Sequence, residues 1–596
     1  MIYPATEDDD GTDVGSSAAG KVLAEGARLC LTYVKRCKAI FSMAVLGAAM
    51  YGVLLVVGTE VIGYATDEIL IPTFDSDAER GNLGWLVAAL IGISFLRSSG
   101  VVMRRYFGAM TTERNNKHLR RALGETYLDR SVTDLKARPT GELLAHADTD
   151  VEVSTMLLQP LPFTLGMFVL AAAASISLLS IDIWLLGVAS LVFPATWIAN
   201  RIFTQKVIAP ASKVRKAVGD VTAVVHESLD GALVVKTLGR EADEVQRLTQ
   251  SADRLRKTRT QIGRLRATFE PTLDTLPSLG MVAVLAIGAW RISDGNVTTG
   301  QVIQAMILFQ QLAFPIRIIG FFLEENAMSV VAARRLKKAF KVNTPLQATG
   351  TETLGEGPLA IEFNNVTYRY GNQTVLEGCS FQIDTGEIVA LVGETGAGKT
   401  TIAQLLFGLI EPHHGSITVG NYQLPEINPQ TLRERISLVS QETFLFADHL
   451  TQNVKLYREI DNREIDKHAK TAQVDFVNEM PDRWGTLVGE RGVTLSGGQR
   501  QRIAITRALV GDPGFLMLDD STSAIDPILE GEILEALRKN LSTTTLVVAH
   551  RLSTIKLAKR VLFLHQGSIV ASGSHEELLK NSDYADLVKA YERDAK

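Results

Sequence analysis

The sequence has few cysteines and little net charge, and each shortage excludes a class of protein. Its 596 residues include three cysteines, Cys30, Cys37 and Cys379, whose spacing indicates neither a disulfide framework nor a metal site. We expect Cys30 and Cys37 to pack as small apolar residues. With 61 basic and 66 acidic side chains the formal net charge is −5, which argues against a protein that binds polyanions. No nucleic-acid partner is therefore expected.

The N-terminus lacks the basic start and the apolar run of a secretory signal. Residues 1–20 are instead acidic and rich in Gly, Ser and Ala, with EDDDGTD at positions 7–13. A segment of this composition cannot bury enough apolar surface to fold by itself. We predict a disordered acidic tail over residues 1–25.

Long apolar runs are abundant between about residues 41 and 322. Six of them approach or exceed the roughly 20 residues that a helix needs to cross a bilayer. So many runs in one part of a chain disfavour the alternative, buried helices of a soluble protein. We therefore predict a polytopic α-helical membrane domain over residues 26–340, in contact with a lipid bilayer. The predicted transmembrane helices are 41–65, 83–103, 161–180, 183–202, 273–292 and 302–323.

Basic residues gather in two of the connections between these runs. The segment after the second run contains Arg104, Arg105, Arg114 and Lys117, and the segment after the fourth is equally basic, while the other connections are short or acidic. The positive-inside rule then places both termini and the two long connections in the cytosol, with the chain in the cell membrane. The long connections are polar and helical in pattern, so we expect the helices to continue well past the membrane.

A linker with the composition of turns is predicted at residues 341–358, and the character of the chain changes after it. From residue 359 to 596, short β-rich runs such as EIVALVG, FLMLDD and TTLVVAH alternate with helical patterns. This alternation is typical of an α/β domain with a mostly parallel sheet. The predicted fold is therefore a membrane domain fused to an α/β domain.

The stretch EIVALVGETGAGKTTIAQLLFGL contains the strongest motif, a strand that leads into a phosphate-binding loop and then a helix. The backbone N–H groups of such a loop cradle phosphates, Lys399 reaches the outer phosphates, and the Thr400 hydroxyl can ligate Mg²⁺. We therefore predict that the α/β domain is a P-loop NTPase cassette, with ATP and Mg²⁺ as its cofactors. The residues expected to bind the nucleotide here are Gly393, Glu394, Thr395, Gly396, Ala397, Gly398, Lys399, Thr400 and Thr401.

Two adjacent carboxylates end the apolar run FLML at positions 515–518. An acidic residue at the end of such a strand holds the Mg²⁺ shell in P-loop NTPases, which is the role we predict for Asp519. Asp520 then lies where a carboxylate could orient the attacking water.

LSGGQRQRIAITRAL, which starts at Leu495, resembles the signature loop of ATP-binding cassette proteins, and the family's other motifs stand around it in family order. Tyr370 matches the aromatic that stacks on adenine. Gln441 matches the loop that touches Mg²⁺ and faces the membrane domain, and His550 matches the histidine that contacts the γ-phosphate. VGERG at 488–492 resembles a motif of the exporter branch, and SAID at 523–526 matches the loop that crosses between two cassettes.

The resemblance covers nearly all of the chain beyond the tail and implies an exporter-type half-transporter that hydrolyses ATP as a dimer. Residues 138–152 and 229–244 resemble the two intracellular loops whose short coupling helices seat on the cassettes. Two cassettes would sandwich two ATP molecules head to tail. The signature loop of each chain would then complete the site of the other through Ser496, Gly497, Gly498 and Gln499.

The resemblance also singles out Asp520, because the family usually has Glu at this position. Asp is one methylene shorter, and a displacement of about 1 Å at a reacting centre can cost about 10²-fold in rate. Either Asp520 still works with help from the backbone or a water, or the site is slow and a different half-transporter supplies the catalytic Glu. We predict the second, a heterodimer with asymmetric sites. The catalytic set is then Asp520, His550 and Gln441, and the Mg²⁺ ligands are Thr400, Gln441 and Asp519.

No pattern in the spans names the cargo, which could be a small molecule or a lipid. Charged residues in membrane spans are expensive and are therefore candidates for contact with the cargo. Export of an amphipathic or lipophilic solute is the leading hypothesis. Import of a siderophore-like compound on the same fold, and a non-transporting ATP-gated regulator, are the alternatives. The charged candidates in or next to the spans are Glu60, Arg97, Asp274, Arg317, Glu324 and Glu325.

Overall fold

The protein is described by a computed structural model, which divides into two compact units. One unit, here called the helical unit, consists of residues 1–128 and 139–342, and the other, the cassette unit, of 129–138 and 343–596. The residues that the structure describes are 16–72, 83–136, 138–341, 350–520, 524–540 and 543–594.

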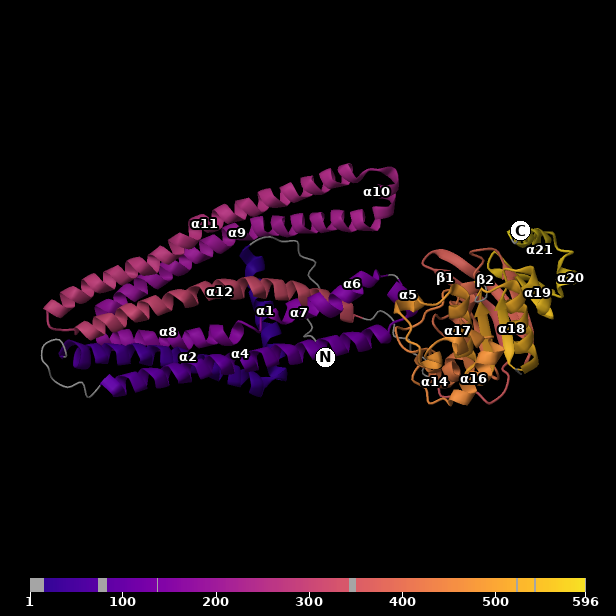
Figure 1. Ribbon diagram of the computed structural model, residues 1–596, viewed down its shortest axis with the longest axis horizontal. Coiled ribbons are helices and arrows are strands. Elements are labelled where there is room, and N and C mark those ends of the chain that lie inside the picture. The colour runs from indigo at the N-terminus through magenta and orange to yellow at the C-terminus, as the bar shows by residue number, and fades with distance from the viewer. Residues whose placement is uncertain are drawn as a thin grey trace. The chain divides into compact units, whose positions relative to one another are not determined.

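Six long helices dominate the helical unit, as predicted (Figure 1). They are α2 (Lys38–Ala65), α4 (Leu83–Leu128), α8 (Leu161–Ile181), α9 (Ile183–Asp230), α11 (Glu241–Ser293) and α12 (Thr299–Phe340). Within the described residues, five helical stretches are long and apolar enough to cross a membrane, and they include the first five predicted spans. The sixth predicted span lies in α12, where the side chains of 313–321 fall outside the described residues.

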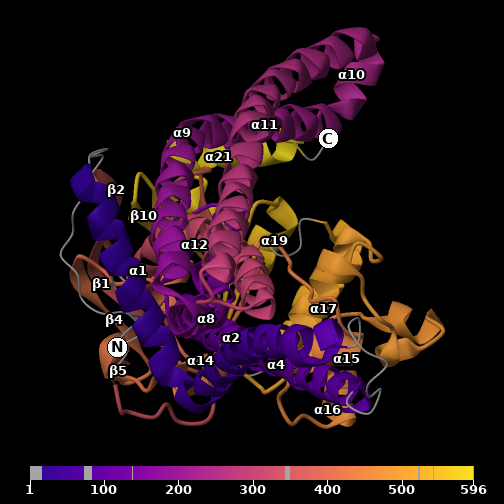
Figure 2. The ribbon, with the colours of Figure 1, turned by 90° about the vertical axis from the view of Figure 1, so that its left-hand side faces the viewer.

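Four of these helices, α4, α9, α11 and α12, are much longer than a bilayer requires, and α9 and α11 are the longest. Helix α9 has 48 residues and α11 has 53, whereas roughly 20 suffice to cross the hydrocarbon core. The two run side by side, and the short helix α10 (Ala232–Leu238) joins their ends (Figure 2). The expected continuation of the helices past the membrane is therefore present. Predicted intracellular loop 138–152 contains α6 (Thr140–Ala145) and the π-helical turn His146–Asp150, which leads into α7 (Val151–Met156).

Helix α1 (Ser16–Arg36) differs from the prediction, because it begins inside the segment expected to be disordered. The helix buries an apolar face that includes Leu29, Cys30 and Tyr33, and the Tyr33 hydroxyl donates to Ser154 Oγ at 3.3 Å. Burial of that face compensates the entropy lost on ordering, which composition alone could not predict. Residues 1–15 lie outside the described residues.

Buried polar contacts join the helices near one end of the bundle. The Asp182 carboxylate caps α9 by accepting from Trp184 N at 2.8 Å and also pairs with Arg291 of α11 at 2.7 Å. Asp67 accepts from Gly300 N at 2.7 Å at the start of α12. A Cβ on Gly300 would lie 2.1 Å from Gly63 O, so α2 and α12 approach too closely there for any side chain.

The cassette unit contains a six-stranded sheet in the order β10-β9-β3-β8-β7-β6. All neighbouring pairs are parallel except β10 with β9, which confirms the prediction of a mostly parallel sheet. The strands are β3 (Ile388–Gly393), β6 (Ile436–Val439), β7 (Phe515–Asp519), β8 (Thr544–Val548), β9 (Arg560–His565) and β10 (Ser568–Gly573). Every residue of β7 and β8 is buried, as expected for strands covered on both faces.

A second, antiparallel sheet has the order β2-β1-β4-β5. Its strands are β1 (Ile361–Tyr370), β2 (Gln373–Ile383), β4 (His414–Val419) and β5 (Tyr422–Gln423). The larger helices of the cassette unit are α13 (Lys399–Leu406), α16 (Asn462–Thr471), α17 (Gly497–Leu509), α18 (Pro527–Asn540) and α21 (Ser582–Asp594). The shorter ones are α5 (Val132–Lys136), α14 (Pro429–Arg435), α15 (Leu450–Lys455), α19 (Leu552–Leu557) and α20 (His575–Leu578).

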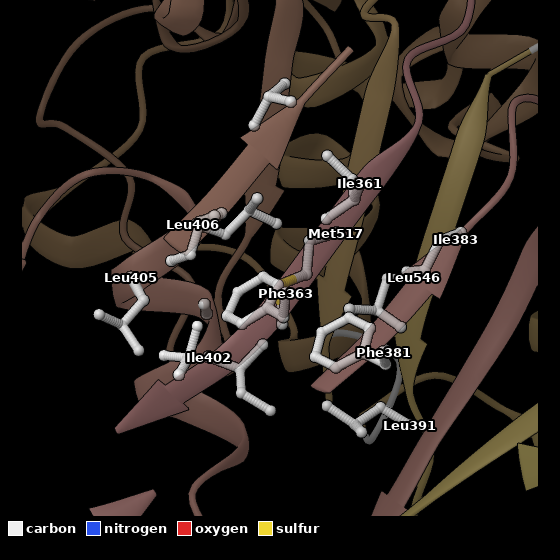
Figure 3. Close-up of a cluster of buried hydrophobic side chains, with 14 of the residues drawn as sticks. Ile361, Phe363, Phe381, Ile383, Leu391, Ile402, Leu405, Leu406, Met517 and Leu546 are labelled. Atoms are coloured by element: carbon white, nitrogen blue, oxygen red, sulfur yellow. The ribbon is translucent and has the colours of Figure 1, made fainter. Parts of the chain in front are cut away.

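The main core of the cassette lies between the two sheets and α13 (Figure 3). The rings of Phe363 in β1 and Phe381 in β2 stack there at a centroid distance of 4.5 Å and an interplanar angle of 15°. Apolar side chains from α13 and the parallel strands surround them, among them Ile402, Leu391 and Met517. This core therefore fixes α13, the helix that follows the phosphate-binding loop, against the sheet.

Replacing Phe363 by Ala is expected to destabilise the cassette by about 3–5 kcal/mol, because it deletes a buried ring and leaves a cavity that the two sheets cannot close. Thermal unfolding of the purified chain should show the cassette transition at a lower temperature. Phe444→Ala is the matched control, since Phe444 also packs against a second ring, that of Phe446, but is 52% exposed. An equal loss of stability in both variants would contradict the prediction.

Candidate nucleotide-hydrolysis site

The predicted phosphate-binding loop connects the end of β3 at Gly393 to the start of α13 at Lys399. Gly396 and Gly398 have φ angles of +86° and +107°, in the left-handed region that side chains rarely adopt. A Cβ on Gly398 would also lie 2.7 Å from Leu376 Cδ2. The two glycines let the backbone turn sharply, so that the loop can present its N–H groups to phosphates at the helix N-terminus.

The Lys399 side chain is buried and folds back over this loop. Its Nζ donates to Gly393 O at 2.6 Å and to Glu394 O at 2.8 Å. Burial lowers the pKa of Lys399, and the carboxylates of Asp519 and Asp520 oppose that shift. An ammonium that donates to main-chain oxygens can exchange them for phosphate oxygens, which bind a cation more strongly.

Asp519 is the last residue of β7 and is buried beside the loop, where the Thr400 hydroxyl hydrogen-bonds to its carboxylate. Burial raises the pKa of Asp519, and the neighbouring Asp520 raises it further. Two of the predicted Mg²⁺ ligands are thus in contact. A hydroxyl and a carboxylate are a donor set that fits Mg²⁺, which prefers oxygen ligands.

Asp520 and Gln441 meet beside this pair. Gln441 Nε2 donates to Asp520 Oδ2 at 3.1 Å, and Asp520 has a left-handed φ of +44°. Burial and the charge of Lys399 lower the pKa of His550, whereas Asp520 acts in the opposite direction. His550 therefore lies within electrostatic reach of both Lys399 and Asp520.

The site lies at the carboxyl ends of four adjacent parallel strands, which is where open α/β sheets bind their ligands. Strand β3 leads into the loop with Lys399, and β8 is followed by His550. Strand β7 ends at Asp519 and is followed by Asp520, and β6 is followed by Gln441. Residues from widely separated parts of the sequence are thus brought together as one constellation.

Tyr370, the predicted adenine platform, ends β1 and is 39% exposed. Its hydroxyl donates to Gln404 Oε1 at 2.8 Å, and Gln404 belongs to α13. The ring packs edge-on against Tyr368 at 5.0 Å. The contact with Gln404 ties the tyrosine to the helix that follows the phosphate-binding loop, and the ring keeps an exposed surface on which a base could stack.

The signature residues lie at the start of α17 rather than in this constellation. Ser496 caps the helix, since its Oγ accepts from Gln499 N at 3.2 Å and its own N donates to Gln499 Oε1 at 2.9 Å. Cβ atoms on Gly497 and Gly498 would lie within about 3 Å of Ala524. Ala524 N also donates to Gln501 Oε1 at 3.0 Å, so the signature helix holds Ala524 in place. Ser523 lies outside the described residues.

Two family models and several known proteins match this chain. A model of the ABC transporter transmembrane region matches residues 39–316, and a model of the ABC transporter family matches residues 376–523. An ATP-dependent lipid A-core flippase of Thiobacillus denitrificans is 31% identical over 569 residues, which cover 94% of this chain and 96% of that protein. The chain belongs to the ABC transporter family. This transporter chain is thus an ATPase, and its cassette is cytoplasmic in a multi-pass membrane protein.

Two further matches concern the architecture of the transporter. A multidrug efflux ATP-binding/permease protein of Mycobacterium bovis is 31% identical over 543 residues, which cover 89% of this chain but only 44% of that protein. The solved structure of a bacterial Atm1-family ABC exporter with ATP bound matches with a TM-score of 0.75 and 25% identity, over 93% of this chain and 98% of that one. The transporter therefore has the exporter-type fold that the sequence predicted.

Sequence reasoning missed several residues around the site. Tyr591 in α21 donates from its hydroxyl to Gly393 O at 3.1 Å and packs its ring against His550. Arg551 donates to Ile525 O at 2.9 Å and pairs with the buried Glu530 at 3.0 Å, which connects the loop of His550 to the loop after the aspartates. Tyr591 belongs to no contiguous motif, so the sequence offered no signal for it. Arg551 follows His550 and Ile525 lies in the SAID motif, but no local pattern shows that these two residues meet.

The charged candidates for cargo contact are only partly described. Glu60 accepts from Ser177 Oγ at 2.9 Å, and Ser177 in turn accepts from Gln304 Nε2 at 3.0 Å, so a polar chain crosses α2, α8 and α12. Arg97 is half-buried and Asp274 is exposed. The side chains of Arg317 and Glu324 fall outside the described residues, while Glu325 is half-buried.

Proposed function

We propose that this transporter chain exports an amphipathic or lipophilic solute as one half of a heterodimer in which its own ATP site is slow. The observation that carries the slow site is the short carboxylate of Asp520, which is bonded to Gln441 where the attacking water would be oriented. The names of two relatives, a lipid A-core flippase and a multidrug efflux protein, support a lipophilic cargo. The chain covers 44% of the second relative, which fits a unit that needs a second half.

The proposed cycle begins when ATP binds between two cassettes. The loop amides and Lys399 hold the phosphates, Tyr370 stacks on the adenine, and His550 meets the γ-phosphate. Ser496 and the amides of Gly497 and Gly498 complete the site of the partner chain. The contacts of the signature residues with the partner's nucleotide exist only in the closed state. They therefore favour closure, which turns the membrane domain outward. Hydrolysis removes them and resets the transporter.

The roles at the reacting phosphate divide among the acidic residues. Mg²⁺ bound at Thr400, Asp519 and Gln441 would neutralise the charge that develops on the phosphate oxygens. Asp520 would accept the hydrogen bond of the attacking water. A glutamate there would reach about 1.5 Å farther at an unchanged backbone, by one C–C bond length, and misplacement on that scale can cost about 10²-fold. ATP would accordingly stay bound in this site longer than in the partner site.

The deciding experiment measures mass and Mg²⁺-ATPase activity of the chain purified alone in detergent, and then of the chain co-purified with a second half-transporter from the same cells. We expect little turnover from the chain alone and activity only in the mixed complex. Vigorous turnover by a homodimer of this chain would reject the heterodimer. Uptake of labelled lipid or dye into inside-out vesicles by the active complex would then test export.

A further inference from the structure

The C-terminal helix α21 packs on the cassette next to the phosphate-binding loop. Tyr584 and Val588 of this helix are buried in a cluster with Val392 of β3 and Phe563 of β9. This anchoring places Tyr591, two turns beyond Tyr584, beside the end of β3. The hydroxyl of Tyr591 donates to Gly393 O at 3.1 Å.

The same carbonyl oxygen is the closer of the two acceptors of Lys399, whose Nζ lies 2.6 Å from it. A carbonyl oxygen has two lone pairs and can accept both bonds at once. If Lys399 turns toward the phosphates of a nucleotide, its Nζ moves away from Gly393 O. Gly393 is buried, and a buried carbonyl that loses a partner costs about as much free energy as a lost hydrogen bond. The hydroxyl of Tyr591 would still donate to this oxygen and so would offset that cost.

The ring of Tyr591 has a second contact in the site. It lies 5.7 Å from the imidazole of His550, centroid to centroid, at an angle of 58°. Burial raises the pKa of Tyr591 to about 12, and the carboxylates of Asp520 and Glu394 add to the shift. The hydroxyl therefore keeps its proton at neutral pH and remains a donor.

We propose that Tyr591 is a positioning residue of the nucleotide site, which frees Lys399 for the phosphates through its hydroxyl and orients His550 through its ring. The C-terminal helix thereby contributes to nucleotide affinity, although it lies outside every nucleotide motif of the sequence. The inference rests on ATP binding by this cassette and is independent of the cargo and of the identity of the partner chain.

The hydroxyl is tested by Tyr591→Phe in the full-length chain, with dissociation constants for ATP and for ADP measured by displacement of a fluorescent nucleotide. We expect both constants to rise about fivefold, because Lys399 leaves Gly393 O for either nucleotide and one net hydrogen bond is lost. Tyr584→Phe is the matched control: it removes a hydroxyl from the same helix, one that lies 2.9 Å from His575 Nδ1. This control should leave both constants within twofold of the parent.

The ring is tested by Tyr591→Ala. Because His550 is expected to meet only the γ-phosphate, loss of the ring should weaken ATP about fivefold more than ADP, and Tyr591→Phe should restore the parent ratio of the two constants. The inference is overturned if Tyr591→Phe changes the constants no more than Tyr584→Phe does. It is equally overturned if Tyr591→Ala weakens ATP and ADP alike. If Tyr591→Ala does not fold, the comparison of the two Phe variants decides alone.

Discussion

Asp520→Glu is expected to raise the rate of ATP hydrolysis at this chain's own site by about 10- to 100-fold, the scale of loss that a displacement of about 1 Å produces. The extra methylene would carry the carboxylate toward the position of the attacking water. Gln441 Nε2 donates to Asp520 Oδ2 at 3.1 Å, and the longer side chain keeps an acceptor for that amide. Single-turnover hydrolysis with labelled ATP in the assembled pair measures the change.

Two variants accompany this experiment. Asp520→Asn keeps the length of the side chain but removes its basicity, and it should lower hydrolysis at this site further. Asp586→Glu is the matched control for an added methylene, because Asp586 is an exposed residue of α21 that pairs with Lys589. A rate that stays unchanged or falls in Asp520→Glu would show that side-chain length does not limit this site, and the argument for asymmetry would fail.

Ser496→Asp is expected to lower the rate of ATP turnover by the pair about 10³-fold. Asp is as good an N-cap as Ser, so the capping box with Gln499 and the fold of α17 should survive. The added carboxylate would face the γ-phosphate of the partner's ATP. Two like charges about 4 Å apart at an effective dielectric of about 20 repel by roughly 4 kcal/mol, which corresponds to about 10³-fold. Steady-state ATPase activity of the purified pair measures the loss.

Ser496→Asn separates charge from capping, since Asn also caps but is neutral, and it should retain most of the activity. Lys399→Ala in the same chain disables only its own slow site, so it should cost the pair far less turnover than Ser496→Asp. Equal losses from Lys399→Ala and Ser496→Asp would indicate two equivalent sites, as in a homodimer, and would contradict the proposed asymmetry.

The sequence by itself determined the parts of this transporter whose chemistry is contained in a continuous stretch. A bilayer requires about 20 apolar residues in a row, so the first five spans could be located without any knowledge of packing. A phosphate-binding loop needs its glycines, Lys399 and Thr400 next to one another, because a single turn of backbone cradles the phosphates. The resemblance of the signature loop to ABC transporters depended on contiguous residues in the same way.

Only the tertiary structure decided which separate stretches meet. Helix α1 begins at Ser16, inside the tail of residues 1–25 that composition predicted to be disordered. It forms because Tyr33 and its apolar neighbours in the helix are buried by packing. The pair of Asp182 with Arg291 and the bond of Gln441 to Asp520 each join residues that lie far apart in the chain. Tyr591 reaches Gly393 only because α21 folds back onto β3. Such contacts depend on where packing places whole elements, and no local pattern of residues encodes that placement.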